Sequence, residues 1–272
     1  MKRDDMRSSE PRGDSGFPLN LVRTGPRTAG TVVLIHAVGF DLTYWDRQID
    51  ALQSAYDVIA FDLPGHGSSP AKPEYWSFAN AAAMVAEVIR QAGERPVHLV
   101  GISFGGMIAQ ATALAHPTLI RSLTLIGTAP TFPAPVRAGM RARAEAVRAG
   151  GMRAVLESSL DRWFTPETRV RRPDLIDRVS KTVLHDDPAI HAAIWDLIAN
   201  DFDVEARLGE IACPTLVLVG ERDPSTPPAV AAQMASGIRN ARMVVLPSTS
   251  HMATLESPEA VNAELLAFLS AS

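Results

Sequence analysis

The chain has 272 residues, 46% of them hydrophobic, which is enough for one large domain or for a domain with an insertion. Its net charge of −4 and its pI near 6.0 argue against a nucleic-acid binder, so we expect no nucleic-acid partner. The longest apolar stretch, around residues 99–115, is interrupted by Ser103, Gln110 and glycines, and therefore predicts no membrane-spanning helix.

The first half of the chain alternates between strand-like and helix-like segments. Residues 1–16 are charged and contain Gly and Ser, which predicts a loose tail, and they lack the apolar segment of a secretory signal. We therefore expect a cytoplasmic protein. Apolar and β-branched runs predict strands at 17–22, 31–35, 57–61, 96–100 and 120–127. Helices are expected at 44–52, at 77–93 with Ser77 as its N-cap, and at 107–115.

The pattern changes after residue 128. Residues 129–205 contain no strand-like run and instead show helical segments rich in Arg, Ala and Leu, separated by glycines and prolines. Strands are predicted again at 215–219 and 243–246, with helices from 228 and at 257–269. We predict an α/β fold with a mostly parallel sheet flanked by helices, formed by residues 1–128 and 206–272, and a helical cap at 129–205. The single cysteine, Cys213, begins an apolar run and is predicted to be a buried small hydrophobe rather than a nucleophile.

The segment Gly101-Ile102-Ser103-Phe104-Gly105-Gly106 lies between a predicted strand and a predicted helix. It matches the G-x-S-x-G turn, which holds a nucleophilic serine in a strained conformation at the end of a strand. Tiny flanking residues are needed there, and the glycines meet that need. Gly-rich strand–helix turns also serve packing or phosphate binding, so the motif alone does not decide the function.

A serine hydroxyl needs a base, and the base needs an orienting acid, which predicts a triad in the chain order Ser, acid, His. Asp223 follows the predicted strand at 215–219, and His251 follows the one at 243–246. Glu221 is a neighbouring rival, but Asp223 lies farther out in the loop. Because parallel strands bring their carboxyl ends to one edge of the sheet, we predict that Ser103, Asp223 and His251 meet there.

An oxyanion hole requires two backbone N–H donors, which we assign to Val38 and Phe104. The other histidines are predicted to be structural: His36 packs under the oxyanion loop, and His66 shapes a Gly-His-Gly turn. Residues 185–191 contain two His and two Asp, but their spacing fits a helix boundary better than a metal site. We expect no metal and no organic cofactor.

The sequence resembles α/β-hydrolases of the 3-oxoadipate enol-lactonase type over nearly the whole chain after residue 17. The phrases that carry the resemblance are Asp62-Leu-Pro-Gly-His-Gly-Ser, the serine turn, Val147-Arg-Ala-Gly-Gly-Met, Arg162-Trp-Phe-Thr-Pro, Asp223-Pro-Ser-Thr-Pro-Pro and His251-Met-Ala-Thr-Leu-Glu-Ser-Pro. The chain departs from that family at His36-Ala-Val-Gly-Phe and at Pro64, where an arginine is common. Both departures resemble general esterases and lactonases.

The resemblance implies a serine hydrolase that cleaves a small ester or lactone through an acyl-enzyme. Alternatives with the same triad are a broad carboxylesterase, an acyl-homoserine lactonase and a C–C bond hydrolase; a receptor on a hydrolase scaffold is the non-enzyme alternative. Trp163 is a candidate substrate-pocket wall, with a core tryptophan as the competing interpretation. Residues 137–172 contain nine Arg and four acidic residues. This positive charge indicates either a lid that attracts carboxylated substrates or an ordinary solvated helix surface. The sequence is also compatible with a homodimer.

Overall fold

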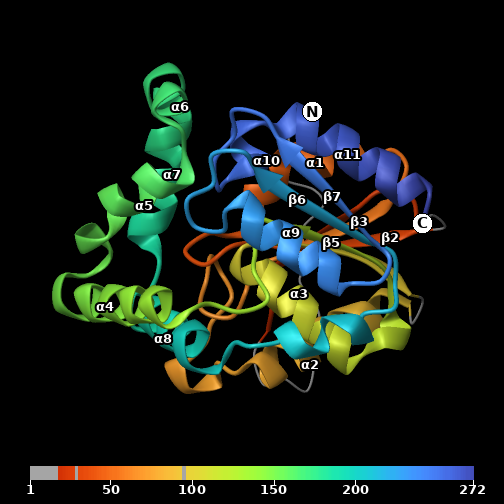
Figure 1. The fold of residues 1–272 in the computed structure, drawn as a ribbon, viewed down its shortest axis with the longest axis horizontal. Helices are drawn as coiled ribbons and strands as arrows, with labels where there is room; N and C mark the ends of the chain where they lie inside the picture. The colour runs from red at the N-terminus through yellow and green to blue at the C-terminus, as the bar shows by residue number, and fades with distance from the viewer. Residues whose placement is uncertain (1–17, 28–29, 94–95) are drawn as a thin grey trace.

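A mixed sheet forms the centre of the computed structural model, which describes residues 18–27, 30–93 and 96–272. Within these residues the sheet has seven strands in the order β1-β3-β2-β4-β5-β6-β7 (Figure 1). β1 pairs antiparallel with β3, and the other neighbours pair parallel, which confirms the predicted mostly parallel α/β sheet. The strands are β1 (Leu21–Thr24), β2 (Thr31–Ile35), β3 (Asp57–Phe61), β4 (Val97–Ile102), β5 (Ile120–Ile126), β6 (Thr215–Gly220) and β7 (Ala241–Leu246).

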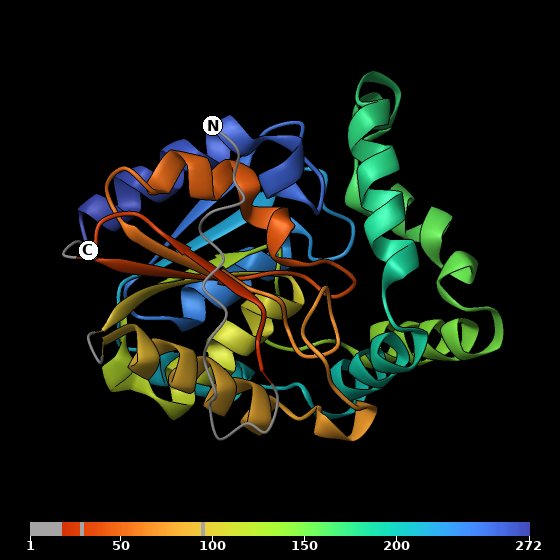
Figure 2. The ribbon, with the colours of Figure 1, turned by 180° about the vertical axis from the view of Figure 1, so that it is seen from behind.

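Helices cover both faces of the sheet (Figures 1 and 2). Val33 and Ile35 of β2 pack into one apolar cluster, and Val32 and Leu34 pack into the other, because successive strand side chains point to opposite faces. The first cluster includes side chains of α2 (Phe78–Gly93), α3 (Phe104–Ala115) and α9 (Pro228–Gly237). The second includes side chains of α1 (Asp46–Leu52), α10 (Ala253–Glu256) and α11 (Pro258–Ser270). None of the described helices is long and apolar enough to cross a membrane.

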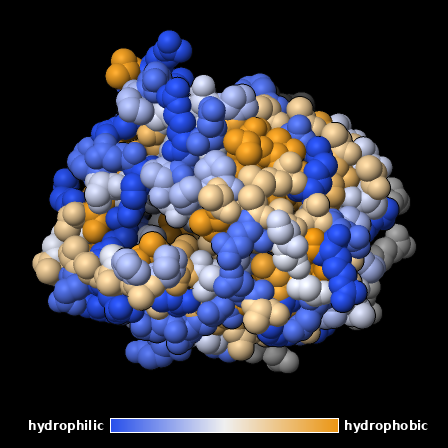
Figure 3. All heavy atoms as spheres, in the orientation of Figure 1, coloured by the Kyte–Doolittle hydropathy of each residue, from blue (hydrophilic) through white to orange (hydrophobic). Residues whose placement is uncertain are grey.

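A helical insertion lies between β5 and β6 and projects from one side of the sheet (Figure 2). It consists of α4 (Ala134–Gly150), α5 (Leu156–Trp163), α6 (Pro166–Arg171), α7 (Pro173–His185) and α8 (Pro188–Asp201). α4 and α8 pack along each other, and an ion pair between Arg148 and Asp196 joins them. The visible outer face of the insertion is mainly hydrophilic, and the surface is hollowed where it meets the sheet domain (Figure 3).

Several predicted elements differ from the structure at their boundaries. The strand predicted at 17–22 is observed at Leu21–Thr24, and residue 17 lies outside the described part. The helix predicted at 44–52 begins as a 3-10 turn, η2 (Leu42–Trp45), because the Asp41 carboxylate accepts a hydrogen bond from the Thr43 N–H. Ser77 caps α2 as predicted, since its Oγ accepts from the Asn80 N–H at 3.0 Å. Cys213 is half-buried rather than fully buried.

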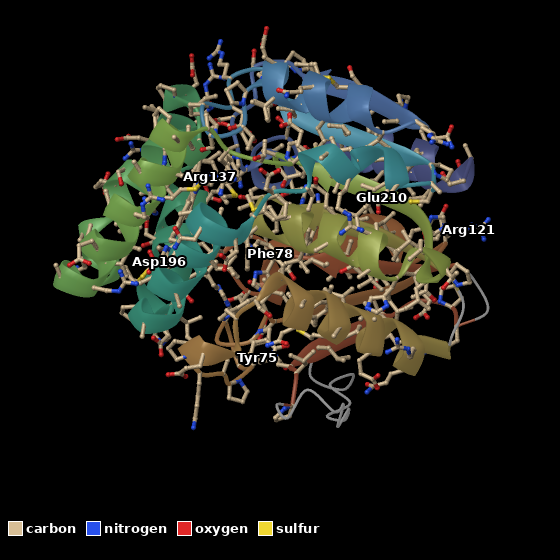
Figure 4. All side chains as sticks on the ribbon, turned by 60° about the horizontal axis from the view of Figure 1, so that its bottom comes forward. Tyr75, Phe78, Arg121, Arg137, Asp196 and Glu210 are labelled. Atoms are coloured by element: carbon tan, nitrogen blue, oxygen red, sulfur yellow. The ribbon has the colours of Figure 1, made fainter. Side chains whose placement is uncertain are left out.

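Arg137 of α4 ties the two ends of the insertion together (Figure 4). Its guanidinium donates to the carbonyl of Phe132, at the entrance, at 2.7 Å. At the exit it donates to the carbonyls of Ala199 at 2.9 Å and Phe202 at 2.7 Å. The Phe202 ring packs on Phe78 of α2, with ring centroids 4.6 Å apart. The planar fork of an arginine suits such multiple acceptors, so this residue fixes how the insertion leaves the sheet domain.

We expect Arg137→Met to loosen the insertion without unfolding the sheet. The substitution leaves three carbonyls without their charged donor, which costs about 2 kcal/mol in unfolding free energy. Hydrogen exchange should accelerate in α4 and around residues 199–203, while β4 keeps its protection. Arg141→Met is the matched control, because Arg141 is exposed and its guanidinium lies 3.5 Å from the Asn200 side-chain oxygen. Equal exchange in the two variants would contradict this role.

Candidate active site

The serine turn has the strained geometry that its glycines predict. Ser103 follows β4 and precedes α3 with φ of 52° and ψ of −116°, a conformation that L-residues rarely adopt. A Cβ on Gly101 would lie 2.3 Å from the Gly105 carbonyl oxygen, and a Cβ on Gly105 would lie 2.2 Å from the Ile35 carbonyl oxygen. The Ser103 N–H donates to the Ile126 carbonyl at 2.9 Å, which anchors the turn to β5.

Gly105→Ala is expected to destabilise the protein by about 3 kcal/mol, because its Cβ would meet backbone rather than a movable side chain. Gly139→Ala is the matched control: Gly139 lies inside α4, and a Cβ there meets no atom within 4 Å. Alanine should stabilise that helix by up to about 1 kcal/mol. Urea unfolding of the two variants measures both effects. A Gly105→Ala variant as stable as the parent would show that the turn tolerates a side chain.

Three loops bring the predicted triad residues into hydrogen-bonding contact. The Nε2 atom of His251 lies 3.0 Å from Ser103 Oγ, and its Nδ1 atom lies 2.8 Å from Asp223 Oδ2. His251 is 4% exposed and Asp223 is 3% exposed, so the acid–base pair is shielded from water. The loops that follow β4, β6 and β7 all leave the same edge of the sheet, which is why residues 148 positions apart meet.

Four donors surround the Asp223 carboxylate. Its Oδ1 accepts from the N–H groups of Ser225 at 2.8 Å and Thr226 at 3.0 Å, and its Oδ2 accepts from Thr226 Oγ1 at 2.7 Å and faces His251. Burial alone would raise the pKa of Asp223, but the charge of His251 and these hydrogen bonds outweigh it and lower the pKa. Glu221, the rival acid, is exposed and instead accepts from the Ser248 N–H at 2.8 Å.

The two predicted oxyanion donors come from the loop after β2 and from the start of α3. Val38 lies in the loop after β2 and is 4% exposed, and Phe104 is the first residue of α3. Among the described residues, neither backbone N–H has a hydrogen-bond acceptor. His36 is fully buried beneath this loop, and its Nε2 accepts from the Leu63 N–H at 2.9 Å. Because burial lowers the pKa of His36 to about 3, it stays neutral and structural.

Glu256 of α10 connects two loops through hydrogen bonds, and the sequence alone predicted no role for it. Its Oε2 accepts from the Ser250 N–H at 2.5 Å, directly before His251. Its Oε1 accepts from the Thr165 N–H at 2.8 Å and from Thr165 Oγ1 at 2.6 Å, at the N-cap of α6. The Glu256 carboxylate therefore connects the histidine loop to the insertion. α10 itself was missed, because four residues are too few to show helical periodicity.

A second buried network supports the oxyanion loop from the insertion. Trp195 Nε1 donates to His191 Nε2 at 2.9 Å, so His191 carries its proton on Nδ1, which donates to Asp186 Oδ2 at 2.7 Å. A Cβ on Gly39 would lie 3.2 Å from the His191 ring, so this network packs directly on the residue after Val38. Of the four residues at 185–191, Asp187 caps α8 by accepting from the Ala189 N–H.

Trp163 ends α5 of the insertion and faces the segment that follows β2. Its ring is 4% exposed and packs on Phe40, with ring centroids 5.2 Å apart. A surface depression of about 260 Å³ lies elsewhere, lined by Ala113, Pro117, Ile120, Arg121, Ile211, Ala212 and Cys213. Those residues flank the starts of β5 and β6, at the end of the sheet opposite the triad. Among the described residues, no group of three His, Cys, Asp or Glu side chains is arranged to hold a metal ion.

Comparisons with known proteins identify the family of the chain. Residues 30–258 match the model of the α/β hydrolase fold family. The chain is 29% identical to a 3-oxoadipate enol-lactonase of Acinetobacter baylyi, covering 90% of both proteins. It is 30% identical to a 2-hydroxy-6-oxononadienedioate/2-hydroxy-6-oxononatrienedioate hydrolase of Cupriavidus pinatubonensis, covering 94% of this chain and 92% of the relative. The enol-lactonase of Burkholderia xenovorans LB400 superposes with a TM-score of 0.87 at 28% identity, covering 94% of this chain and 97% of that structure. The chain therefore belongs to the α/β-hydrolase family.

Proposed function

We propose that this protein is a serine hydrolase that cleaves a small carboxylic ester or lactone through an acyl-enzyme, with an enol-lactone-like substrate. The observation that carries the proposal is the continuous chain from Ser103 Oγ through His251 to Asp223, at 3.0 and 2.8 Å. A nucleophile, a base within hydrogen-bond reach and a buried acid that orients the base are the parts that such catalysis requires.

In the first step Ser103 Oγ attacks the substrate carbonyl carbon while His251 Nε2 takes the hydroxyl proton. Asp223 accepts from His251 Nδ1–H and stabilises the imidazolium that forms. The N–H groups of Val38 and Phe104 bind the developing oxyanion, each contributing about 3 kcal/mol to the transition state. His251 then protonates the leaving oxygen, which stays attached to the acyl group when the substrate is a lactone.

In the second step His251 takes a proton from water as the water attacks the acyl-enzyme carbonyl. The tetrahedral intermediate collapses, the carboxylic acid leaves, and the proton returns to Ser103 Oγ. The burial of His251 and Asp223 favours this route, since the charged pair is then screened little by water. We also propose that Trp163, packed on Phe40, forms a wall of the acyl pocket.

A substrate panel tests the proposal: enol-lactones, simple lactones, acyl-homoserine lactones, 4-nitrophenyl esters and vinylogous 1,5-diketones. We expect the highest kcat/KM with lactones or esters. A C–C bond hydrolase is the second candidate, favoured by the 30% identity to the Cupriavidus hydrolase over 94% of the chain. Turnover of the diketones alone would select that candidate. No turnover of any member, together with no labelling of Ser103 by a fluorophosphonate, would leave a non-enzymatic receptor as the function.

A further inference from the structure

The arginines of the insertion divide into two groups by their partners. Most are exposed or bound to groups within the chain: Arg137 to backbone carbonyls, Arg148 to Asp196, Arg169 to Glu157 and Asp161, and Arg172 to Asp174. These arginines therefore stabilise the insertion or face solvent, in line with the interpretation of residues 137–172 as a solvated surface. Arg143 and Arg162 differ, because the first is buried, the second is half-buried, and neither forms an ion pair with a carboxylate among the described residues.

Arg143 is 7% exposed and points inward from α4. Its guanidinium stacks over Trp195 at 5.0 Å from the ring centroid and donates to Ser159 Oγ, while its Nε is buried without an acceptor. Arg162 of α5 is half-buried, its Nε is also buried without an acceptor, and no described residue accepts a hydrogen bond from its side chain. Leaving buried N–H groups unpaired costs free energy, and leaving a buried charge unpaired costs more.

Arg143 reaches the part of α5 that carries Arg162, because it donates to Ser159 Oγ and Ser159 lies about one helical turn before Arg162. Burial lowers the pKa of Arg143, and the positive charge of Arg162 lowers it further. Burial also lowers the pKa of Arg162. Two like charges in a shielded place destabilise the folded chain unless an anion joins them. A carboxylate has two oxygens that match the arginine fork, as a phosphate also does.

Both arginines are connected to the candidate catalytic loops, either through their own backbone or through one or two intervening side chains. The Arg162 carbonyl accepts from Ser250 Oγ at 3.1 Å, and the Trp163 carbonyl accepts from the Met252 N–H at 3.0 Å, so α5 touches the chain on both sides of His251. On the other side, Arg143 stacks on Trp195, which donates to the His191 that packs on Gly39. The α5 backbone at Arg162 therefore adjoins the histidine loop, and Arg143 connects through Trp195 and His191 to the oxyanion loop.

We propose that Arg143 and Arg162 form a subsite for a carboxylate carried by the substrate, so that the enzyme acts on acidic esters or lactones. This inference rests on the proposed function, since it concerns the substrate class of the same site. The subsite would hold the end of the acyl chain remote from the reacting carbonyl. Binding energy gained there orients the carbonyl towards Ser103, as remote contacts do in other enzymes.

The test compares two esters that differ chiefly in the terminal charge: mono-(4-nitrophenyl) glutarate and 4-nitrophenyl valerate. The parent protein should have the higher kcat/KM with the glutarate ester. Arg143→Gln and Arg162→Gln should each lower the ratio of the two kcat/KM values by about 10-fold or more, the range of a charge-assisted hydrogen bond. Arg153→Gln is the control: it removes the same charge from an exposed position of the insertion and should change the ratio less than about 2-fold.

A binding measurement separates failure of the subsite from failure of the proposed function. Free glutarate should raise the melting temperature of the parent and of Arg153→Gln, but not of Arg162→Gln. Without glutarate, Arg162→Gln should melt no lower than the parent, because an unpaired shielded charge has been removed. A parent that favours the valerate ester, or variants that keep both the preference and the glutarate shift, would overturn the subsite. A glutarate shift without any ester turnover would support the subsite and overturn the proposed hydrolysis.

Discussion

Replacing Ser103 with alanine is expected to reduce turnover by a factor on the order of 10⁶, because the nucleophile and its proton are lost together. Ser103 Oγ faces His251 Nε2, and the hydroxyl has no other hydrogen-bond partner among the described residues. The fold should therefore survive, and unfolding free energy should stay within about 0.5 kcal/mol of the parent. The measurement is kcat/KM on the best ester or lactone of the panel, with urea unfolding beside it.

Ser236→Ala is the control for this substitution. Ser236 is exposed on α9, and its hydroxyl donates to the Ala232 carbonyl at 2.8 Å rather than to a triad residue. That variant should keep the parental rate. A Ser103→Ala variant with more than about one-hundredth of the parental rate would contradict the role of Ser103 as nucleophile.

Asp223→Asn is the second large effect, with an expected loss in kcat of about 10⁴. The hydrogen bonds around the side chain dictate how an asparagine would sit. The N–H groups of Ser225 and Thr226 require an oxygen at the Oδ1 position, so the amide NH₂ must occupy the Oδ2 position and face His251 Nδ1. His251 Nδ1 would then accept, and its proton would move to Nε2, where it blocks proton transfer from Ser103.

Glu221→Gln provides a matched control two residues away, because it makes the same chemical change in an exposed acid. It should alter kcat by less than about 3-fold, since exposed charges contribute little. The paired measurement also identifies the acid of the triad. A loss in Glu221→Gln as large as that in Asp223→Asn would exclude Asp223 as the orienting group.

Local patterns in the sequence predict most of the sheet domain. Periodicity and turn residues place the strands of the sheet and the helices α2, α9 and α11, and the glycines around Ser103 predict the strained turn that is observed. The meeting of Ser103, Asp223 and His251 follows from topology, because parallel strands end at one edge. The helices of the insertion were predicted only as a group, since their boundaries depend on prolines and on packing.

Contacts between distant parts of the chain could not be predicted in the same way. Glu256 braces Thr165, 91 residues earlier, and Arg137 reaches the carbonyl of Phe202. Nothing in the local sequence distinguishes these side chains from ordinary surface charges. The same holds for Arg143 and Arg162, which stand out among the arginines of the insertion only when burial and partners are known. The composition indicated that the insertion carries an excess of positive charge. The structure identifies which of its arginines have no carboxylate partner among the described residues.

The most direct measurement of the central claim is mass spectrometry of the protein quenched with acid during turnover of a slowly hydrolysed ester. Ser103 is expected to carry the acyl mass on its peptide in the parent. Ser103→Ala should carry none. Steady turnover with no adduct on the Ser103 peptide, or an adduct on another residue that accounts for the rate, would contradict the account.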